Sequence, residues 1–144
     1  MTELASRASS MLCLPVCFLP GLGGGKSTCP FHCAVGTSKQ ANPNHTPTTN
    51  GCGPSGLSVA TKDFDFGPCC DAHDLCYDTC GKTKEQCDEG FQECMNTLCA
   101  SSYGQNQGCK AAGSLFYMGA LLMGCESYKT SQKNACLCVP KDEL

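Results

Sequence analysis

Hydrophobic residues between positions 84 and 100 recur every three or four residues, which predicts a helix with one buried face. The residues on that face are Cys87, Phe91, Cys94, Met95 and Leu98. We expect Phe91 and Met95 to pack in the protein core rather than against lipid, because they share the stripe with three other apolar side chains.

A shorter helix is predicted from about Pro68 to Cys80, antiparallel to the first. Its Cys69 would pair with Cys94, and its Cys76 with Cys87. Both pairs are symmetric about the same point in the sequence, which is what a helical hairpin of constant register requires. The pattern therefore predicts two antiparallel helices linked by two disulfides.

The residues between the helices support a hairpin turn. Gly81 is suited to a left-handed cap at the end of the first helix, and Thr83 with Gln86 forms a capping-box pattern before the second. In this register His73 would face Gly90, which has no side chain to block a close approach. Asp88 would lie about half a turn away, near enough to accept a hydrogen bond from His73 Nδ1–H.

Three further segments lie outside this hairpin. Residues 110–123 are apolar but shorter than the roughly 20 residues that cross a bilayer, so a packed helix or one wall of a hairpin is expected. Residues 34–50 are rich in Asn, Thr, Pro and Ser and predict an irregular surface segment. Residues 1–28 form a weak signal-like or atypical N-terminal segment.

Composition restricts the class of protein. The chain has 144 residues and 16 cysteines, which is typical of a single disulfide-stabilised domain made in an oxidising compartment. A net charge of −3 without a basic run gives no support for nucleic-acid binding. The chain has no Trp and few basic residues, so only modest binding to a membrane surface is expected.

The sequence Lys141-Asp142-Glu143-Leu144 matches the retrieval signal of the endoplasmic reticulum. Together with the cysteine content, it predicts a protein of the secretory pathway, either in the lumen of the endoplasmic reticulum or secreted. The KDEL retrieval receptor is the partner that this signal implies.

The candidate chemistry is concentrated between Cys69 and Tyr77. His73 and Asp74 are adjacent, and neighbours on a helix point about 100° apart, so they must serve different tasks. A histidine titrates near neutral pH and suits a general base, whereas a carboxylate is a ligand for a hard cation. The pattern favours a base directed at a substrate beside a metal ligand.

These residues, Cys-Cys-Asp-Ala-His-Asp-Leu-Cys-Tyr, closely resemble the secreted phospholipase A2 superfamily. The stretch from Cys87 to Cys94 shares the resemblance, and the run from Asn50 to Gly53 and the tail from Ala135 to Cys138 are most similar to the group XII branch. The resemblance covers the chain from Cys29 onward. It implies a mainly α, small disulfide-rich fold at residues 29–140, with two antiparallel disulfide-linked core helices and a calcium-binding loop.

The resemblance also implies a reaction, the calcium-dependent hydrolysis of the sn-2 ester of glycerophospholipids to a fatty acid and a lysophospholipid. His73 would be the base, and Asp88 would fix its tautomer and stabilise the imidazolium. Tyr77 would hydrogen-bond to Asp88. The implied partner is phospholipid at a membrane surface, bound peripherally by a monomer.

For Ca²⁺, the resemblance implies Asp74 together with the backbone carbonyls of Gly51, Gly53 and Ser55, in a loop that a Cys52–Cys70 disulfide would hold beside Asp74. Oxygen ligands of this kind suit Ca²⁺. After its cysteine the loop has Gly-Pro-Ser-Gly instead of the common Gly-x-Gly-Gly. The segment from Cys52 to Cys70 is also slightly longer than in the common branches, so Leu57 is an alternative ligand to Gly51, and weak Ca²⁺ binding is expected.

The chain also lacks a good candidate for the N-terminal helix that lines the acyl slot in common members of the superfamily, because residues 1–28 contain two prolines within an apolar stretch. Residues 110–123 would then wall the slot. A lipid- or receptor-binding module with weak or absent catalysis is the alternative function on the same scaffold. The sequence leaves open the pairing of the other cysteines, which are Cys13, Cys17, Cys29, Cys33, Cys80, Cys99, Cys109, Cys125, Cys136 and Cys138.

Overall fold

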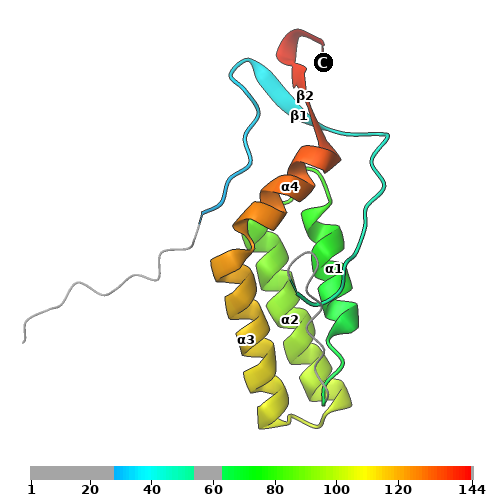
Figure 1. The fold of residues 1–144 in the computed structure, drawn as a ribbon, viewed down its shortest axis with the longest axis vertical. Helices are drawn as coiled ribbons and strands as arrows, with labels where there is room; N and C mark the ends of the chain where they lie inside the picture. The colour runs from blue at the N-terminus through cyan, green and yellow to red at the C-terminus, as the bar shows by residue number, and fades with distance from the viewer. Residues whose placement is uncertain (1–27, 54–62, 144) are drawn as a thin grey trace, which may run out of the picture.

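Three helices lie side by side in the computed structural model, which describes residues 28–53 and 63–143 (Figure 1). They are α1 (Gly67–Tyr77), α2 (Lys84–Ser102) and α3 (Gln107–Met123). A fourth helix, α4 (Cys125–Ala135), crosses the end of this bundle where α1 ends and α2 begins. It leads into a two-stranded antiparallel ribbon of β1 (Thr37–Ala41) and β2 (Cys136–Pro140), followed by the short 3₁₀ helix η1 (Lys141–Glu143).

The α1–α2 hairpin is antiparallel as predicted. The disulfides Cys69–Cys94 and Cys76–Cys87 both form, with Cα atoms 5.7 and 5.6 Å apart. The capping box at the start of α2 is also confirmed, because the Thr83 side chain accepts from Gln86 N and the Gln86 side chain accepts from Thr83 N. Constant register and a local cap were enough to predict this hairpin.

The end of α1 differs from the prediction, because the helix stops at Tyr77 rather than Cys80. The carbonyls of Tyr77 and Thr79 both accept hydrogen bonds from the buried Nε2 of Gln132, at 2.8 Å each. These bonds from α4 replace the next helical turn. Gly81 has the expected left-handed backbone (φ 86°), but it lies in the turn between the helices and does not cap α1.

Residues 110–123 are helical, which decides between the two expectations for this segment. The helix α3 begins at Gln107, with the Asn106 side chain accepting from Cys109 N. It packs closely on α2, because a Cβ at Gly113 would lie only 3.3 Å from Cβ of Met95. Phe66 and Met95 are fully buried at this contact, so the predicted core position of Met95 is confirmed.

The prediction of an irregular segment at residues 34–50 is wrong for Thr37–Ala41, which forms strand β1. Its partner lies about a hundred residues away, with Lys39 opposite Cys138. The Cys33–Cys138 disulfide holds the same ribbon. Composition within one segment carries no information about a partner so distant in sequence, and β2 was missed for the same reason. The mostly polar helix α4 was not predicted either.

All fourteen cysteines of the described ranges are in disulfides; Cys13 and Cys17 lie outside those ranges. The pairs are Cys29–Cys125, Cys33–Cys138, Cys52–Cys70, Cys69–Cys94, Cys76–Cys87, Cys80–Cys136 and Cys99–Cys109. The prediction of a mainly α, disulfide-rich fold with two antiparallel disulfide-linked core helices is thereby confirmed.

In the part of the chain that the structure describes, none of the helices is long and apolar enough to span a bilayer. The tail from Lys141 to Glu143 is exposed, and Leu144 lies outside the described residues, so the retrieval signal stays a prediction. The signal-like segment at residues 1–28 lies outside them too, except for Thr28.

Candidate active site

A cavity of about 400 Å³ lies beside His73, between α1, α3 and the segment that precedes α1 in sequence. This segment, residues 42–53, runs down along α1 in Figure 1. The lining residues come from these elements and, in smaller number, from α2, α4 and the α3–α4 junction; they are Asn50, Gly51, Gly53, Cys70, His73, Asp74, Tyr77, Phe91, Leu115, Phe116, Gly119, Ala120, Met123, Gly124 and Ser127. The structure therefore brings together His73, Asp74 and the described glycines of the predicted loop.

His73 on α1 is hydrogen-bonded to Asp88 on α2, as the helical register predicts. The bond joins Nε2 of His73 and Oδ1 of Asp88 at 2.8 Å, so the predicted use of Nδ1 is wrong. Nε2 is at the far end of the ring from the α1 backbone, and only that end reaches across to the partner helix. With Nε2–H donated to Asp88, Nδ1 is the nitrogen that remains to accept a proton.

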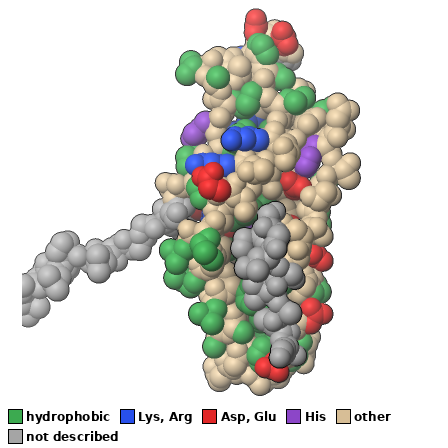
Figure 2. Space-filling view, viewed as in Figure 1, with side chains coloured by type: hydrophobic (Ala, Val, Ile, Leu, Met, Phe, Trp, Pro, Cys, Tyr) green, Lys and Arg blue, Asp and Glu red, His purple; other side chains and the backbone are tan. Residues whose placement is uncertain are grey.

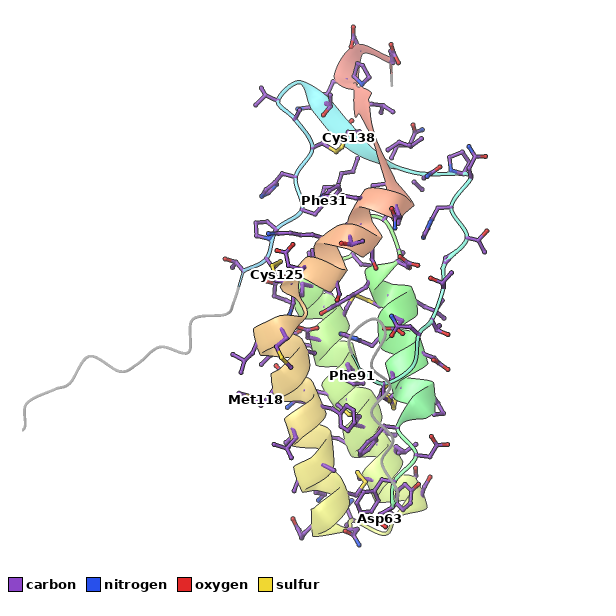
Figure 3. The ribbon with its side chains drawn as sticks, in the orientation of Figure 1. Phe31, Asp63, Phe91, Met118, Cys125 and Cys138 are labelled. Atoms are coloured by element: carbon purple, nitrogen blue, oxygen red, sulfur yellow. A yellow bond between two sulfur atoms is a disulfide. The ribbon has the colours of Figure 1, made fainter. Side chains whose placement is uncertain are left out.

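The His73 ring is held between aromatic side chains. It stacks on Phe91 with ring centroids 4.5 Å apart and an interplanar angle of 27°, and it lies 4.2 Å from the Tyr77 ring. Phe91 is buried inside the bundle (Figure 3). The predicted role of Gly90 is wrong, because Gly90 is exposed and a Cβ there would meet nothing within 4 Å. Phe91, one position later, is the residue of α2 that faces the imidazole.

Asp88 accepts hydrogen bonds from three side chains, and only 1% of its surface is exposed. Oδ1 accepts from His73 Nε2 and from Tyr77 Oη–H at 2.7 Å, and Oδ2 accepts from Lys84 Nζ at 2.6 Å. Burial raises the pKa of Asp88, but the three hydrogen bonds and the charge of Lys84 outweigh it, so the pKa is lowered overall. Asp88 is therefore ionised at neutral pH.

Lys84 was not predicted to take part in the site. It is 1% exposed, and besides Asp88 it donates to the backbone carbonyl of Ala120 on α3, at 2.8 Å. The signal in the sequence is the spacing of four between Lys84 and Asp88, which places the two side chains on one face of a helix. That spacing is common on exposed helix faces and does not by itself indicate a buried pair.

The predicted contact between Tyr77 and Asp88 is present. Burial, followed by the hydrogen bond to Asp88, raises the pKa of Tyr77, so its hydroxyl stays protonated and acts as a donor. Gly124, between α3 and α4, makes room for this hydroxyl. A Cβ at Gly124 would lie 2.8 Å from Tyr77 Oη and 2.5 Å from the Ala120 carbonyl.

Asp74 meets the loop before α1. Its Oδ2 accepts from Asn50 N at 2.8 Å, and the predicted Cys52–Cys70 disulfide pins the loop next to it. Gly51 and Gly53 both have positive φ (77° and 128°) and line the cavity with Asp74. Ser55 and Leu57, the other predicted ligands, lie outside the described residues.

The chemistry of these groups fits a hard cation. Burial is the largest effect on Asp74 and raises its pKa, with hydrogen bonds from Asn50 and Gly51 opposing the shift. A half-buried carboxylate beside backbone carbonyls suits Ca²⁺. Within residues 28–53 and 63–143, no group of three or more His, Cys, Asp or Glu side chains could hold a metal ion. A cation at Asp74 would therefore depend on backbone oxygens.

The other wall of the cavity is the apolar face of α3, as expected for residues 110–123. Leu115, Phe116 and Met123 contribute side chains to it. The same helix exposes a row of large apolar side chains at its surface, and Figure 2 shows hydrophobic side chains gathered over it. We call this row the α3 rim; it consists of Leu115, Met118, Leu122 and Met123. Two of its members, Leu115 and Met123, also line the cavity, so the rim borders the cavity mouth.

The chain is similar to known proteins over most of its length. A family model described as group XII secretory phospholipase A2 precursor matches residues 12–144. Group XIIA secretory phospholipase A2 of Mus musculus is 34% identical over 126 residues, which cover 81% of this chain and 66% of the relative. Group XIIB secretory phospholipase A2-like protein of Mus musculus is 27% identical over 140 residues, covering 88% of this chain and 72% of the relative.

A similarity over a shorter stretch is to Conodipine-P3 of Conus purpurascens, which is 39% identical over 80 residues, or 53% of this chain and 42% of the relative. The matched region spans about two thirds of the length of the group XIIA relatives. No solved structure matches the chain significantly. The match to the family model and the identity to the group XIIA proteins confirm the resemblance in the residues from Cys29 onward, and the chain belongs to the group XII secretory phospholipase A2 family.

Proposed function

We propose that this chain hydrolyses the sn-2 ester of glycerophospholipids in a calcium-dependent reaction, releasing a fatty acid and a lysophospholipid. The observation that carries the proposal is the position of His73. Its Nε2 is bonded to a buried, ionised Asp88, and the residue lines a largely apolar cavity that Asp74 also lines. A base, a candidate cation ligand and space for an acyl chain thus meet in one place.

In the proposed reaction, His73 Nδ1 takes a proton from water as the water oxygen bonds to the ester carbonyl carbon. Asp88 holds the ring orientation and stabilises the imidazolium that forms. When the tetrahedral centre collapses, the bond to the glycerol oxygen breaks, and the imidazolium returns the proton to that oxygen. His73 is then neutral again, and the products are a fatty acid and a lysophospholipid.

Asp74 and the carbonyls of Gly51 and Gly53, with Ser55 as a further candidate, would hold the Ca²⁺. The ion, when bound, supplies a Lewis acid next to the ester carbonyl. Asn50 N–H, which donates to Asp74 Oδ2 at 2.8 Å, keeps the carboxylate turned towards the loop. The Cys52–Cys70 disulfide, with Cα atoms 5.1 Å apart, keeps the loop near the helix in the absence of the ion.

The α3 rim is the surface we propose to meet the lipid. It is continuous with the cavity through Leu115 and Met123, so a phospholipid leaving the membrane there would enter the cavity along an apolar path. Lys110 is the one charged residue of α3, so attraction to anionic headgroups is weak at this face. We therefore expect binding at this face to depend on apolar contact, for which a neutral phosphatidylcholine surface is sufficient.

The test is hydrolysis of mixed-chain phosphatidylcholine vesicles with millimolar Ca²⁺ and then with EGTA, comparing wild type with His73→Gln. Release of the sn-2 chain by wild type in Ca²⁺, and its absence in EGTA and in the variant, is the expected result. No release by oxidised, folded wild type would reject the enzyme and favour the lipid- or receptor-binding module. A location in the endoplasmic reticulum and binding of the KDEL receptor stay predictions from Lys141–Leu144.

A further inference from the structure

Lys84 is a buried cation at the end of the bundle where α2 begins. It is the first residue of α2 and is 1% exposed. Its Nζ lies 2.6 Å from Oδ2 of Asp88 and 2.8 Å from the carbonyl oxygen of Ala120. An ammonium group is almost never buried unless it is paired, because losing its hydration is costly.

Local helix energetics do not favour a lysine here. A cation in the first turn of a helix is opposed by the positive end of the helix dipole. A lysine four residues before an acid is also the less favourable order for an ion pair along a helix. A buried ion pair is weak evidence for stability, since apolar side chains of the same volume often do as well. The charge of Lys84 therefore needs another explanation.

The explanation lies in the two oxygens of Asp88. Oδ1 carries the bonds from His73 and Tyr77, and Oδ2 carries the bond from Lys84. A carboxylate bonded through one oxygen alone can turn about its Cβ–Cγ bond, whereas donors on both oxygens fix its plane. Lys84 also ties this carboxylate to α3 at Ala120, a residue that lines the cavity.

We propose that Lys84 is a positioning residue: its ammonium group fixes the plane of the Asp88 carboxylate, so that Oδ1 stays directed at His73 Nε2 and the proton stays on Nε2 rather than Nδ1. This inference rests on the proposed role of the His73–Asp88 pair. It assigns no contact with substrate to Lys84, whose action is through Asp88.

The test compares Lys84→Met, which removes the charge and keeps most of the side-chain volume, with Lys82→Met, which makes the same change at an exposed position two residues away. The first readout is the ¹⁵N spectrum of the imidazole rings, which reports the protonated nitrogen. The chain has three histidines, so His73 is assigned by its loss in His73→Gln. Lys84→Met should lose the uniform Nε2–H form of His73, and Lys82→Met should keep it.

The second readout is hydrolysis. Loss of a residue that orients a catalytic group typically lowers the rate by about 10- to 100-fold, and we expect this loss in kcat with little change in KM for Lys84→Met. Lys84→Arg, which keeps the charge and can donate to Oδ2, should recover part of the loss. Unchanged kcat and an unchanged Nε2–H signal in folded Lys84→Met would overturn the proposal.

A further variant covers the case in which Lys84→Met does not fold. Lys84→Met/Asp88→Asn removes both charges of the pair, so no unpaired ion is left buried. If the pair serves orientation, the double variant should fold; if it fails to fold as the single variant does, Lys84 is structural and the proposal is wrong. Should wild type hydrolyse no lipid, the proposed function fails, but the imidazole spectrum still decides the role of Lys84.

Discussion

His73 and Asp88 meet across the α1–α2 hairpin at 2.8 Å, between two disulfides that join the same helices. Cys69–Cys94 lies about one turn before His73, and Cys76–Cys87 about one turn after it. The distance between the two helices at the site is therefore set by covalent bonds and not by the hydrogen bond itself. Side chains of the site can change while the backbone around them keeps its geometry.

His73→Gln should for this reason abolish hydrolysis without unfolding the protein. A glutamine cannot take the proton from water, and loss of a general base costs about 10²- to 10⁴-fold in rate. The checks are the release of fatty acid and the melting temperature of the oxidised variant. Hydrolysis at the wild-type rate by folded His73→Gln would exclude the assigned mechanism.

Asp88→Asn should destabilise the protein in a pH-dependent way. The pKa of Asp88 is lowered in the folded state, so its stabilising contribution is complete above the unfolded pKa of about 3.9 and is lost as pH falls towards the folded pKa. At pH 7 the variant leaves the Lys84 ammonium buried and unpaired, which typically costs about 3–5 kcal/mol.

The measurement is thermal unfolding of wild type and Asp88→Asn at pH 7 and at about pH 2.5. The gap in melting temperature should be wide at pH 7 and should narrow as pH falls below the ordinary carboxyl pKa, because the contribution of the ionised Asp88 is lost in that direction. An equal gap at both pH values would mean that the ionised form of Asp88 contributes nothing to stability.

The sequence predicted what depends on neighbouring residues and missed what depends on distant ones. The register of α1 against α2 followed from cysteine spacing, and it correctly placed His73 near Asp88. It could not tell which ring nitrogen makes the bond, since that depends on the rotation of the side chain. Gly90 was misjudged because register alone does not say which residues point into the gap between the helices.

The missed contributions to the site come from α3 and α4. Near the junction of these helices, Lys84 donates to the Ala120 carbonyl, and Gly124 leaves space for the Tyr77 hydroxyl. Lys84 is in the first turn of α2, which the sequence alone would suggest is exposed, but it is buried and bonded to Ala120 of α3. Such long-range packing has no local pattern from which to predict it.

Asp74→Asn should separate Ca²⁺ binding from folding. Burial raises the pKa of Asp74, so its ionised form opposes folding when no cation is bound, and this cost grows as pH rises through the raised pKa. In EGTA at pH 7, the variant should be at least as stable as wild type. With Ca²⁺, wild type should gain stability as the ion binds the folded state, and the variant should gain none.

Melting temperatures with about 10 mM Ca²⁺ and with EGTA give the result, because about 10 mM exceeds the dissociation constants of about 0.1–1 mM that are typical of extracellular modules. Glu93→Asn is the matched control, because it removes a carboxylate from an exposed position on α2. It should keep the Ca²⁺-dependent rise. A rise in Asp74→Asn equal to that of wild type would place the cation elsewhere.

Leu122→Glu should weaken binding to lipid vesicles. Leu122 is 76% exposed on the α3 rim but does not line the cavity, so the cavity chemistry should be intact. Burying a leucine contributes about 1.5–3 kcal/mol, which corresponds to about 10- to 100-fold in vesicle affinity. Val35→Glu makes a similar change at a fully exposed site just before β1, outside the α3 rim, and should bind as wild type.

Cosedimentation with phosphatidylcholine vesicles measures the affinity, and hydrolysis of a short-chain monomeric phospholipid shows whether the cavity still works. The expected pattern for Leu122→Glu is weak sedimentation with unchanged turnover of the monomeric lipid. Equal sedimentation of Leu122→Glu, Val35→Glu and wild type would exclude the α3 rim as the lipid-binding surface.

Gly124→Ala and Gly90→Ala should have opposite effects on stability. A Cβ at Gly124 would press against Tyr77 Oη at 2.8 Å and against the Ala120 carbonyl at 2.5 Å, so either the hydroxyl leaves Asp88 or the α3–α4 junction moves. Overpacking of this kind costs about 1–3 kcal/mol. A Cβ at Gly90 meets nothing within 4 Å on an exposed helix face, and replacing glycine by alanine there should stabilise by about 0.5–1 kcal/mol.

Thermal unfolding of both variants measures these signs, and hydrolysis adds a second distinction. Gly124→Ala should also lose activity, because Tyr77 is one of the donors that hold Asp88, at 2.7 Å. Gly90→Ala should keep wild-type activity, since the residue that faces His73 is Phe91 and not Gly90. A destabilised or inactive Gly90→Ala would show instead that the absence of a side chain at position 90 is required for the His73–Asp88 contact.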